Sequence, residues 1–314
     1  MQPDVSATGG TIVVGGEALV DVVVGDGDAL AGHAGGGPYN VARTIGRLER
    51  PVTFLGRISP DRLGQRLGRE LTADGVRLDS VVPTQDPTTL ALVETDGAGV
   101  ATYRFYTEGT ATPGLTADDA LAALPDDVAM LHVGTLGLVL EPIATALEAV
   151  VAAAAPTTLV ALDPNCRPDV IPDPDAYRAR LTRILARTDL LKASDADLAW
   201  LDPGVGPVDA ARSLLRDGPD IAVVTLGANG AVVVTADDAV PVPPVPANVV
   251  DTIGAGDAFG GALLVWWHER GLGREDLGSL DQVVEATRFA CVVAAKTCEQ
   301  AGAVPPRLAD LALY

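Results

Sequence analysis

The chain has 314 residues, of which 48% are hydrophobic and only 4% aromatic, which suits one large α/β domain with a core built mainly from Ala, Val and Leu. The formal charge of -20 at pH 7 argues against nucleic acid or an anionic membrane as a partner, because both attract basic surfaces. No apolar run approaches the roughly 18 residues that a membrane span requires.

The cysteines and the N-terminus indicate the compartment. Cys166, Cys291 and Cys298 are odd in number and lack CxxC spacing, which argues against a disulfide framework and a zinc knuckle. The opening residues, MQPDVSATGG, have neither the basic start nor the apolar stretch of a signal peptide. We therefore expect a cytoplasmic protein.

The start of the chain predicts strands and helices in alternation. Residues 11–24, TIVVGGEALVDVVV, open as a dense apolar run typical of a buried strand and lead into a Gly-rich loop. Pro38 begins a helix that continues to Leu48, because proline is favoured in the first helical turn. A strand is expected over 52–58 and a helix over 61–71.

A predicted hairpin interrupts this alternation. Residues 88–95 and 100–106 alternate apolar and polar side chains on either side of the turn DGAG at 96–99. No helix separates the two strands. We interpret them as part of a small β lid.

The alternation then resumes and predicts a parallel sheet with helices on both faces. Strands are expected over 129–134, 157–163, 189–194 and 221–227, and helices over 141–154, 175–186 and 195–201. Ligands bind such sheets at the carboxyl ends of the strands. The Pro-rich segment that starts at Ala239 suits an edge segment or a stiff connection better than a central strand.

The stretch DTIGAGD, residues 251–257, carries the strongest chemical signal. It lies where a helix begins, and glycines at 254 and 256 would let the unpaired backbone N–H groups approach an anion. A carboxylate beside a bound phosphate is repelled by roughly 4 kcal/mol at about 4 Å, so Asp257 needs a functional reason. We interpret it as the general base that takes the proton of a hydroxyl attacking the phosphate. The alternative is a helix-capping aspartate after a tight turn.

Two segments in this order resemble the signatures of the ribokinase-like (phosphofructokinase-B type) sugar kinases. They are GGGPYNVARTIGRL at 35–48 and DTIGAGDAFGGALL at 251–264. The resemblance implies a three-layer core built on a parallel sheet, within a single domain over 1–314, and a small β-strand lid from segments at about 21–36 and 86–108. It also implies that Gly254, Ala255 and Gly256 form the anion hole beside Asp257.

The sugar side can be predicted in part from the residues themselves. Asp21, at the end of the first strand, and Asn40, at the head of a helix, together offer donors and acceptors for neighbouring hydroxyls. Their alternatives are a turn residue and a helix cap. The resemblance adds Gly36 and Gly37 as sugar ligands.

Two arginines are further candidates on the sugar side. Arg104 could close over the sugar from the lid strand, unless an aromatic neighbour does so or the aromatics only pack the lid. The resemblance places Arg167 near the path of the phosphate, and its alternative is a surface ion pair worth under about 1 kcal/mol.

The resemblance further implies a nucleotide and metal side. The nucleotide-binding candidates are Lys192, Ser194, Thr225, Gly227 and Gly230. Asp197 would hold the waters of Mg²⁺ or, alternatively, only cap its helix. A monovalent cation, K⁺, would lie by Asp251, Ile253, Thr297 and Gly302. Pro306 stands where a serine often completes that shell, which argues against the cation.

These features predict an ATP-dependent sugar kinase that transfers the γ-phosphate to a hydroxyl of a small sugar. GEALVDVV, DPNCR and YRFY most resemble the fructokinases. The alternatives are a 2-keto-3-deoxygluconate kinase, another sugar or nucleoside kinase of the family, and a non-catalytic sugar sensor. The resemblance also leaves open a homodimer formed through the lids.

Overall fold

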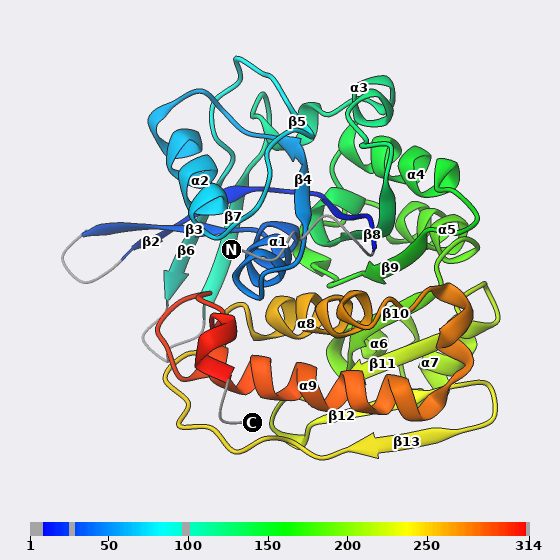
Figure 1. Cartoon of the computed structure of the whole chain (residues 1–314). Helices are drawn as coiled ribbons and strands as arrows, with labels where there is room; N and C mark the ends of the chain where they lie inside the picture. The colour runs from blue at the N-terminus through cyan, green and yellow to red at the C-terminus, as the bar shows by residue number, and fades with distance from the viewer. Residues whose placement is uncertain (1–8, 25–28, 96–100, 312–314) are drawn as a thin grey trace, which may run out of the picture.

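The computed structural model describes residues 9–24, 29–95 and 101–311 and contains two sheets (Figure 1). The main sheet has nine strands in the order β13-β12-β11-β10-β9-β8-β1-β4-β5. Its strands are β1 Thr11–Gly15, β4 Val52–Arg57, β5 Val81–Val82, β8 Val128–Gly134, β9 Leu159–Asp163, β10 Leu190–Ser194, β11 Ile221–Thr225, β12 Ala231–Val234 and β13 Ala239–Val242.

Most strands of the main sheet run parallel, and only β12 pairs antiparallel with its neighbours β11 and β13. Runs of Val, Ile and Leu build the inner strands, as expected for a sheet buried on both faces. Pro241 lies on β13, the edge strand, where a residue without an N–H interrupts no inner ladder. The prediction of an edge segment there is confirmed.

Helices cover both faces of the main sheet (Figure 1). Alternate residues of β1 show the division: Ile12 and Val14 belong to the core shared with α1, α2, α8 and α9, whereas Val13 belongs to the core shared with α3 to α7. The predicted three-layer α/β arrangement is therefore confirmed. The helices are α1 Gly37–Arg47, α2 Arg62–Ala73, α3 Ala117–Ala122, α4 Ile143–Ala153, α5 Pro174–Leu185, α6 Asp195–Leu201, α7 Pro207–Leu215, α8 Ala255–Glu269 and α9 Leu280–Cys298.

A smaller, four-stranded sheet lies beside α1 and α2, in the order β3-β2-β6-β7 (Figure 1). Its strands are β2 Leu19–Val24, β3 Leu30–Gly35, β6 Leu90–Thr95 and β7 Ala101–Tyr106. The predicted turn at 96–99 lies outside the described residues.

One prediction for the start of the chain was wrong. Residues 11–24 form two strands in different sheets, because the chain leaves β1 at Gly16 with φ of 153°, a conformation that favours glycine. Asp21 consequently lies on β2 of the small sheet and not at the end of the first strand. Across the described part of the chain, no helix combines the length and the apolar character that crossing a membrane would take.

Candidate functional site

The carboxyl ends of the parallel strands carry the polar residues of the candidate site. Asp163, Ser194 and Thr225 end β9, β10 and β11, which are neighbours in the sheet. This edge is where open parallel sheets bind ligands, so the topology alone brings these residues together.

The N-terminus of α8 provides the anion cradle that DTIGAGD predicts. Gly254 is the residue before the helix and has φ of 75°, in the left-handed region that favours glycine. A Cβ at Gly254 would lie only 2.6 Å from the Cβ of Ala303, so this turn has no room for a side chain. Asp257 lies in the first turn of α8, where a carboxylate interacts favourably with the helix dipole.

Lys192 brings a positive charge to the same helix terminus. Its Nζ donates to Oδ2 of Asp163 at 2.7 Å, and a Cβ at Gly256 would lie 3.3 Å from this Nζ. Burial alone would lower the pKa of Lys192, but the charge of Asp163 and the hydrogen bond to it outweigh burial and raise the pKa. The ammonium group therefore stays charged beside the predicted anion hole.

Asp257 and Asn40 meet, although 217 positions separate them in the sequence. Nδ2 of Asn40 donates to Oδ2 of Asp257 at 2.9 Å. Burial raises the pKa of Asp257, whereas the Asn40 hydrogen bond and the charges of Lys192 and Arg167 oppose the rise. Oδ1 of Asn40 is buried and accepts no hydrogen bond from the described residues, so it is available to a ligand hydroxyl next to Asp257.

Asp21 and Arg167 lie near the same carboxylate. Burial raises the pKa of Asp21 to about 6; the charge of His33 across the strand pair and that of Arg167 lower it, and the charge of Asp257 raises it. Arg167 thus acts on both Asp21 and Asp257. Its exposed guanidinium donates to the carbonyls of Asn165 and Cys166.

Gly36 and Gly37 lie at the start of α1, where both are close to Glu17. The N–H of Gly37 donates to Oε1 of Glu17 at 2.9 Å. A Cβ at Gly36 would lie 2.7 Å from the carbonyl oxygen of Glu17. Both glycines are therefore explained in part by close packing against Glu17.

Arg104 is not brought together with the other candidates. The register pairs Asp21 with Ala91 and Ala91 with Phe105, so these residues share one face of the small sheet. Arg104 pairs with Leu92 and belongs to the opposite face, where its side chain is exposed. The ring of Phe105 packs with Leu19, Ala91 and Leu136, on the face that carries Asp21.

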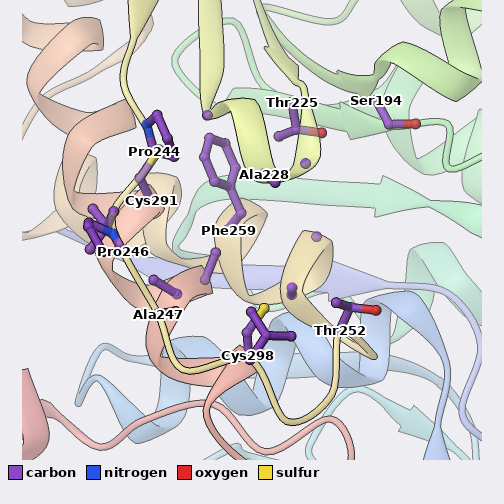
Figure 2. A pocket seen from close by; sticks show the side chains of 18 of the residues that line it. Ser194, Thr225, Ala228, Pro244, Pro246, Ala247, Thr252, Phe259, Cys291 and Cys298 are labelled. Atoms are coloured by element: carbon purple, nitrogen blue, oxygen red, sulfur yellow. The ribbon is translucent and has the colours of Figure 1, made fainter.

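A cavity of about 540 Å³ lies at the α8 N-terminus, and its lining residues differ from the polar cluster of Asp21, Asn40, Arg167 and Asp257 (Figure 2). Four of the five predicted nucleotide-binding residues line it: Ser194, Thr225, Gly227 and Gly230. It extends to Ala255 and Gly256 of the predicted anion hole. Its remaining walls are mostly apolar and come from the segment after β13 and from helices α8 and α9, including Pro244, Val245, Pro246, Ala247, Val249, Phe259, Cys291, Ala294, Ala295 and Cys298.

Comparison with known proteins identifies the family. The sequence profile of the pfkB family of carbohydrate kinases matches residues 12–309. The chain belongs to this family. It is 39% identical to a fructokinase of Rhizobium leguminosarum bv. trifolii over 254 residues, covering 79% of this chain and 77% of that protein. The predicted family and the prediction of a carbohydrate kinase are confirmed.

Two solved structures of the family resemble the whole fold. The fructokinase of Xylella fastidiosa with bound ATP has a TM-score of 0.88 at 27% identity, with 96% of each chain covered. A double mutant of Vibrio cholerae O395 fructokinase, with fructose, ADP and a potassium ion bound, has a TM-score of 0.81 at 26% identity, with 95% of each chain covered.

In this member of the family, Asp197 makes the helix-capping contacts that are the alternative to a magnesium role. Its Oδ2 accepts from the backbone N–H and the hydroxyl of Ser194, and its Oδ1 accepts from the N–H of Cys166 at 2.6 Å. The Asp197 N–H in turn donates to the Ser194 hydroxyl, which completes a capping box at the start of α6. A role in magnesium binding would have to be exerted from this buried, bonded position.

The residues predicted for a monovalent cation form a connected loop. Oδ1 of Asp251 accepts from the N–H of Ile253 at 3.0 Å, and Oδ2 accepts from the N–H of Gly302 at 2.8 Å. Thr297, which is close to Gly302 in the sequence, is buried in the last turn of α9. Within the described ranges, no three or more His, Cys, Asp or Glu side chains form a metal-binding group.

Two buried acids of the site were not predicted. Asp163 entered the predictions only as part of the segment DPNCR, yet it pairs with Lys192, and its Oδ1 is buried without a hydrogen-bond partner among the described residues. Glu17 is 0% exposed and contacts Gly37. The position of Asp163 at a strand end could have indicated its role, whereas Glu17 lies in an apolar run and gives no local signal.

Proposed function

We propose that the protein is a fructokinase that transfers the γ-phosphate of ATP to a hydroxyl of fructose. The observation that carries this proposal is the position of Asp257 in the first turn of α8, bonded to Asn40 and near the charges of Asp21 and Arg167, with a cavity of about 540 Å³ at the same helix terminus. Relatives that match most of the chain are fructokinases, which supports fructose as the acceptor.

In this proposal Asp257 is the general base. A sugar hydroxyl, held by Asp21 and by the free Oδ1 of Asn40, gives its proton to Asp257 as its oxygen bonds to the γ-phosphorus. The bond from that phosphorus to the oxygen bridging to the β-phosphate breaks, and ADP leaves. The raised pKa of Asp257 makes it a better base than an exposed aspartate, and the Asn40 hydrogen bond orients it.

Backbone N–H groups and positively charged side chains stabilise the negative charge of the transferred phosphoryl group. The backbone N–H groups at Gly254, Ala255 and Gly256 would face the phosphate oxygens, as at other helix N-termini. Lys192 is held beside Gly256 by Asp163, and Arg167 lies on the sugar side. The rate then depends mainly on positioning and charge stabilisation, as phosphoryl transfer requires.

We propose Mg²⁺ as the metal that accompanies ATP, where it neutralises phosphate charge. The residues fit such an ion. The unpaired Oδ1 of Asp163 could accept a hydrogen bond from a water bound to Mg²⁺, and Asp197 lies close enough for its charge to raise the pKa of Asp163. The predicted K⁺ would bind by the loop that Asp251 connects to Gly302, near α8. The potassium ion in the Vibrio cholerae structure supports that part of the proposal.

A 2-keto-3-deoxygluconate kinase is the second candidate, and one observation favours it. The exposed guanidinium of Arg167 acts on Asp21 and Asp257 and could pair with a substrate carboxylate.

The test is ADP release from MgATP with fructose, 2-keto-3-deoxygluconate, ribose, glucose and adenosine. We expect turnover to depend on fructose. Turnover with the keto acid alone would move the assignment to the second candidate and make Arg167 the carboxylate ligand. ATP binding without turnover on any acceptor in a wider panel would contradict the kinase.

The compartment and the oligomeric state belong to the same proposal. The free thiols of Cys166, Cys291 and Cys298 support a reducing, cytoplasmic location. Exposed side chains on the small sheet, Leu30 at 68% and Tyr106 at 52%, would be covered if it acts as a lid and pairs with a second copy. Light scattering in solution tests the dimer.

A further inference from the structure

Glu17 is a buried acid in the connection from β1 to β2, where the chain passes from one sheet to the other. It is 0% exposed, and burial raises its pKa to about 8, with the charge of Asp257 adding to the rise. Burying an ionisable group is unfavourable unless its bonds compensate. An apolar residue would avoid that penalty, so the bonds that Glu17 makes need an explanation.

Those bonds connect two loops of the site. Oε1 accepts from the N–H of Gly37, the first residue of α1, at 2.9 Å. Oε2 accepts from the N–H of Gly137 at 3.1 Å, in the 3-10 turn Thr135–Leu138 that follows β8. Since β1 and β8 are neighbours in the sheet, Glu17 links the loops at two adjacent strand ends.

The start of α1 depends on this contact because it lacks a cap of its own. The residue before the helix is Gly36, which has no side chain to accept from the first free N–H groups. Glu17 supplies an acceptor from elsewhere in the chain. One turn further, Asn40 has its backbone N–H bonded to the carbonyl of Gly36 and its side chain bonded to Asp257.

We propose that Glu17 is a positioning residue that fixes the first turn of α1, so that Asn40 holds Asp257 in the orientation for phosphoryl transfer. This rests on the proposed function of Asp257. The chain of contacts is Glu17 to Gly37, the first turn of α1 to Asn40, and Asn40 to Asp257. Because Glu17 acts through Asn40, its loss should slow turnover only while Asn40 is present.

Glu17→Gln and Glu17→Ala test the proposal, and Asp189→Asn is the matched control. Asp189 is 2% exposed and also accepts from a backbone N–H, that of Val160, but it precedes β10 at the opposite end of the sheet from the site. We expect Glu17→Gln to lower kcat about tenfold and Glu17→Ala about a hundredfold, with nucleotide Kd within about twofold. Asp189→Asn should change melting temperature but not kcat.

A double-mutant cycle separates positioning from a general loss of stability. In the Asn40→Ala background, Glu17→Gln should lower kcat by less than about twofold, because its effect passes through Asn40. Multiplicative effects of the two substitutions, or a Glu17→Gln kcat equal to that of wild type, would overturn the proposal.

Hydrogen exchange gives a readout that needs no turnover. In Glu17→Ala, exchange over residues 36–41 and 135–139 should be at least about tenfold faster than in wild type and in Asp189→Asn. Unchanged exchange there overturns the proposed positioning role of Glu17. If the wild-type protein phosphorylates no acceptor, the proposed function fails on that observation. The effect of Glu17 on the first turn of α1 is then accepted or rejected from hydrogen exchange alone.

Discussion

The two sides of the α8 N-terminus differ in chemistry. The proposed sugar side holds Asp21, Asn40, Arg167 and Asp257, each of which makes a hydrogen bond or acts on a neighbouring charge. The cavity on the other side is lined mostly by proline, valine, alanine and cysteine side chains (Figure 2). Sites that hydrogen-bond their ligand reject analogues strongly, whereas apolar walls select mainly by shape. We therefore expect strict choice of the acceptor and loose choice of the donor base.

The largest expected effect comes from removing the base. Asp257→Asn keeps the size of the side chain but cannot take a proton, so kcat should fall about a thousandfold while nucleotide Kd changes by less than about twofold. Steady-state rates and calorimetric nucleotide titration check this. The control is Asp281→Asn, another first-turn acid, at the start of α9. If Asp257 only caps its helix, both substitutions will change stability slightly and leave kcat alone.

A glycine pair in and before α8 tests the geometry of the anion cradle. Gly254→Ala would force a Cβ into a left-handed residue against Ala303, so it should destabilise the fold by about 1–3 kcal/mol and lower kcat about a hundredfold. Gly260→Ala, inside the same helix with no atom within 4 Å of its Cβ, should stabilise by about 0.5–1 kcal/mol with kcat unchanged. Equal kcat in the two variants would contradict the cradle.

The residues of the site also differ in how far the sequence could predict them. Asp257 and the glycines beside it belong to a short local motif and were predicted from the residues themselves, whereas Ser194, Thr225 and Gly230, which line the cavity, were predicted from the family resemblance. The α/β core followed from strand and helix periodicities. Local patterns are strong where a turn or an anion demands particular residue types.

Other parts of the site depend on tertiary structure and left no local pattern. Ala294, Ala295 and Cys298 of α9 line the cavity, yet in sequence they resemble ordinary core residues of a helix. Asp21 was predicted at the end of the first strand, because an apolar run with central glycines does not show that the chain changes sheets. The contact between Asn40 and Asp257 joins distant segments and became visible only in the fold.

KM for the sugar should depend on pH and change by about tenfold, an effect that we expect on the sugar side of the site. Burial raises the pKa of Asp21 to about 6, so Asp21 is mostly ionised at pH 7 and mostly protonated at pH 5. As pH falls through this range it loses acceptor capacity, and KM for the sugar should rise about tenfold. In Asp21→Asn, KM should be higher at pH 7 and nearly independent of pH over this range. A parallel rise in the variant would assign the effect to another group.

The smallest effect is expected at the donor base. Pro244, Val245, Pro246, Ala247 and Val249, which line the cavity, offer no side-chain donor or acceptor, so they could read the edge of a purine only through their backbone groups. We expect kcat/KM for GTP within about tenfold of that for ATP. Phe259→Ala, which removes an aromatic side chain from the cavity wall, should raise KM for the two nucleotides by similar factors. Rejection of GTP by a factor near 10⁴ would show that backbone groups read the base as strictly as we expect Asp21 and Asn40 to read the sugar, and the contrast between the two sides would then be one of residue type and not of selectivity.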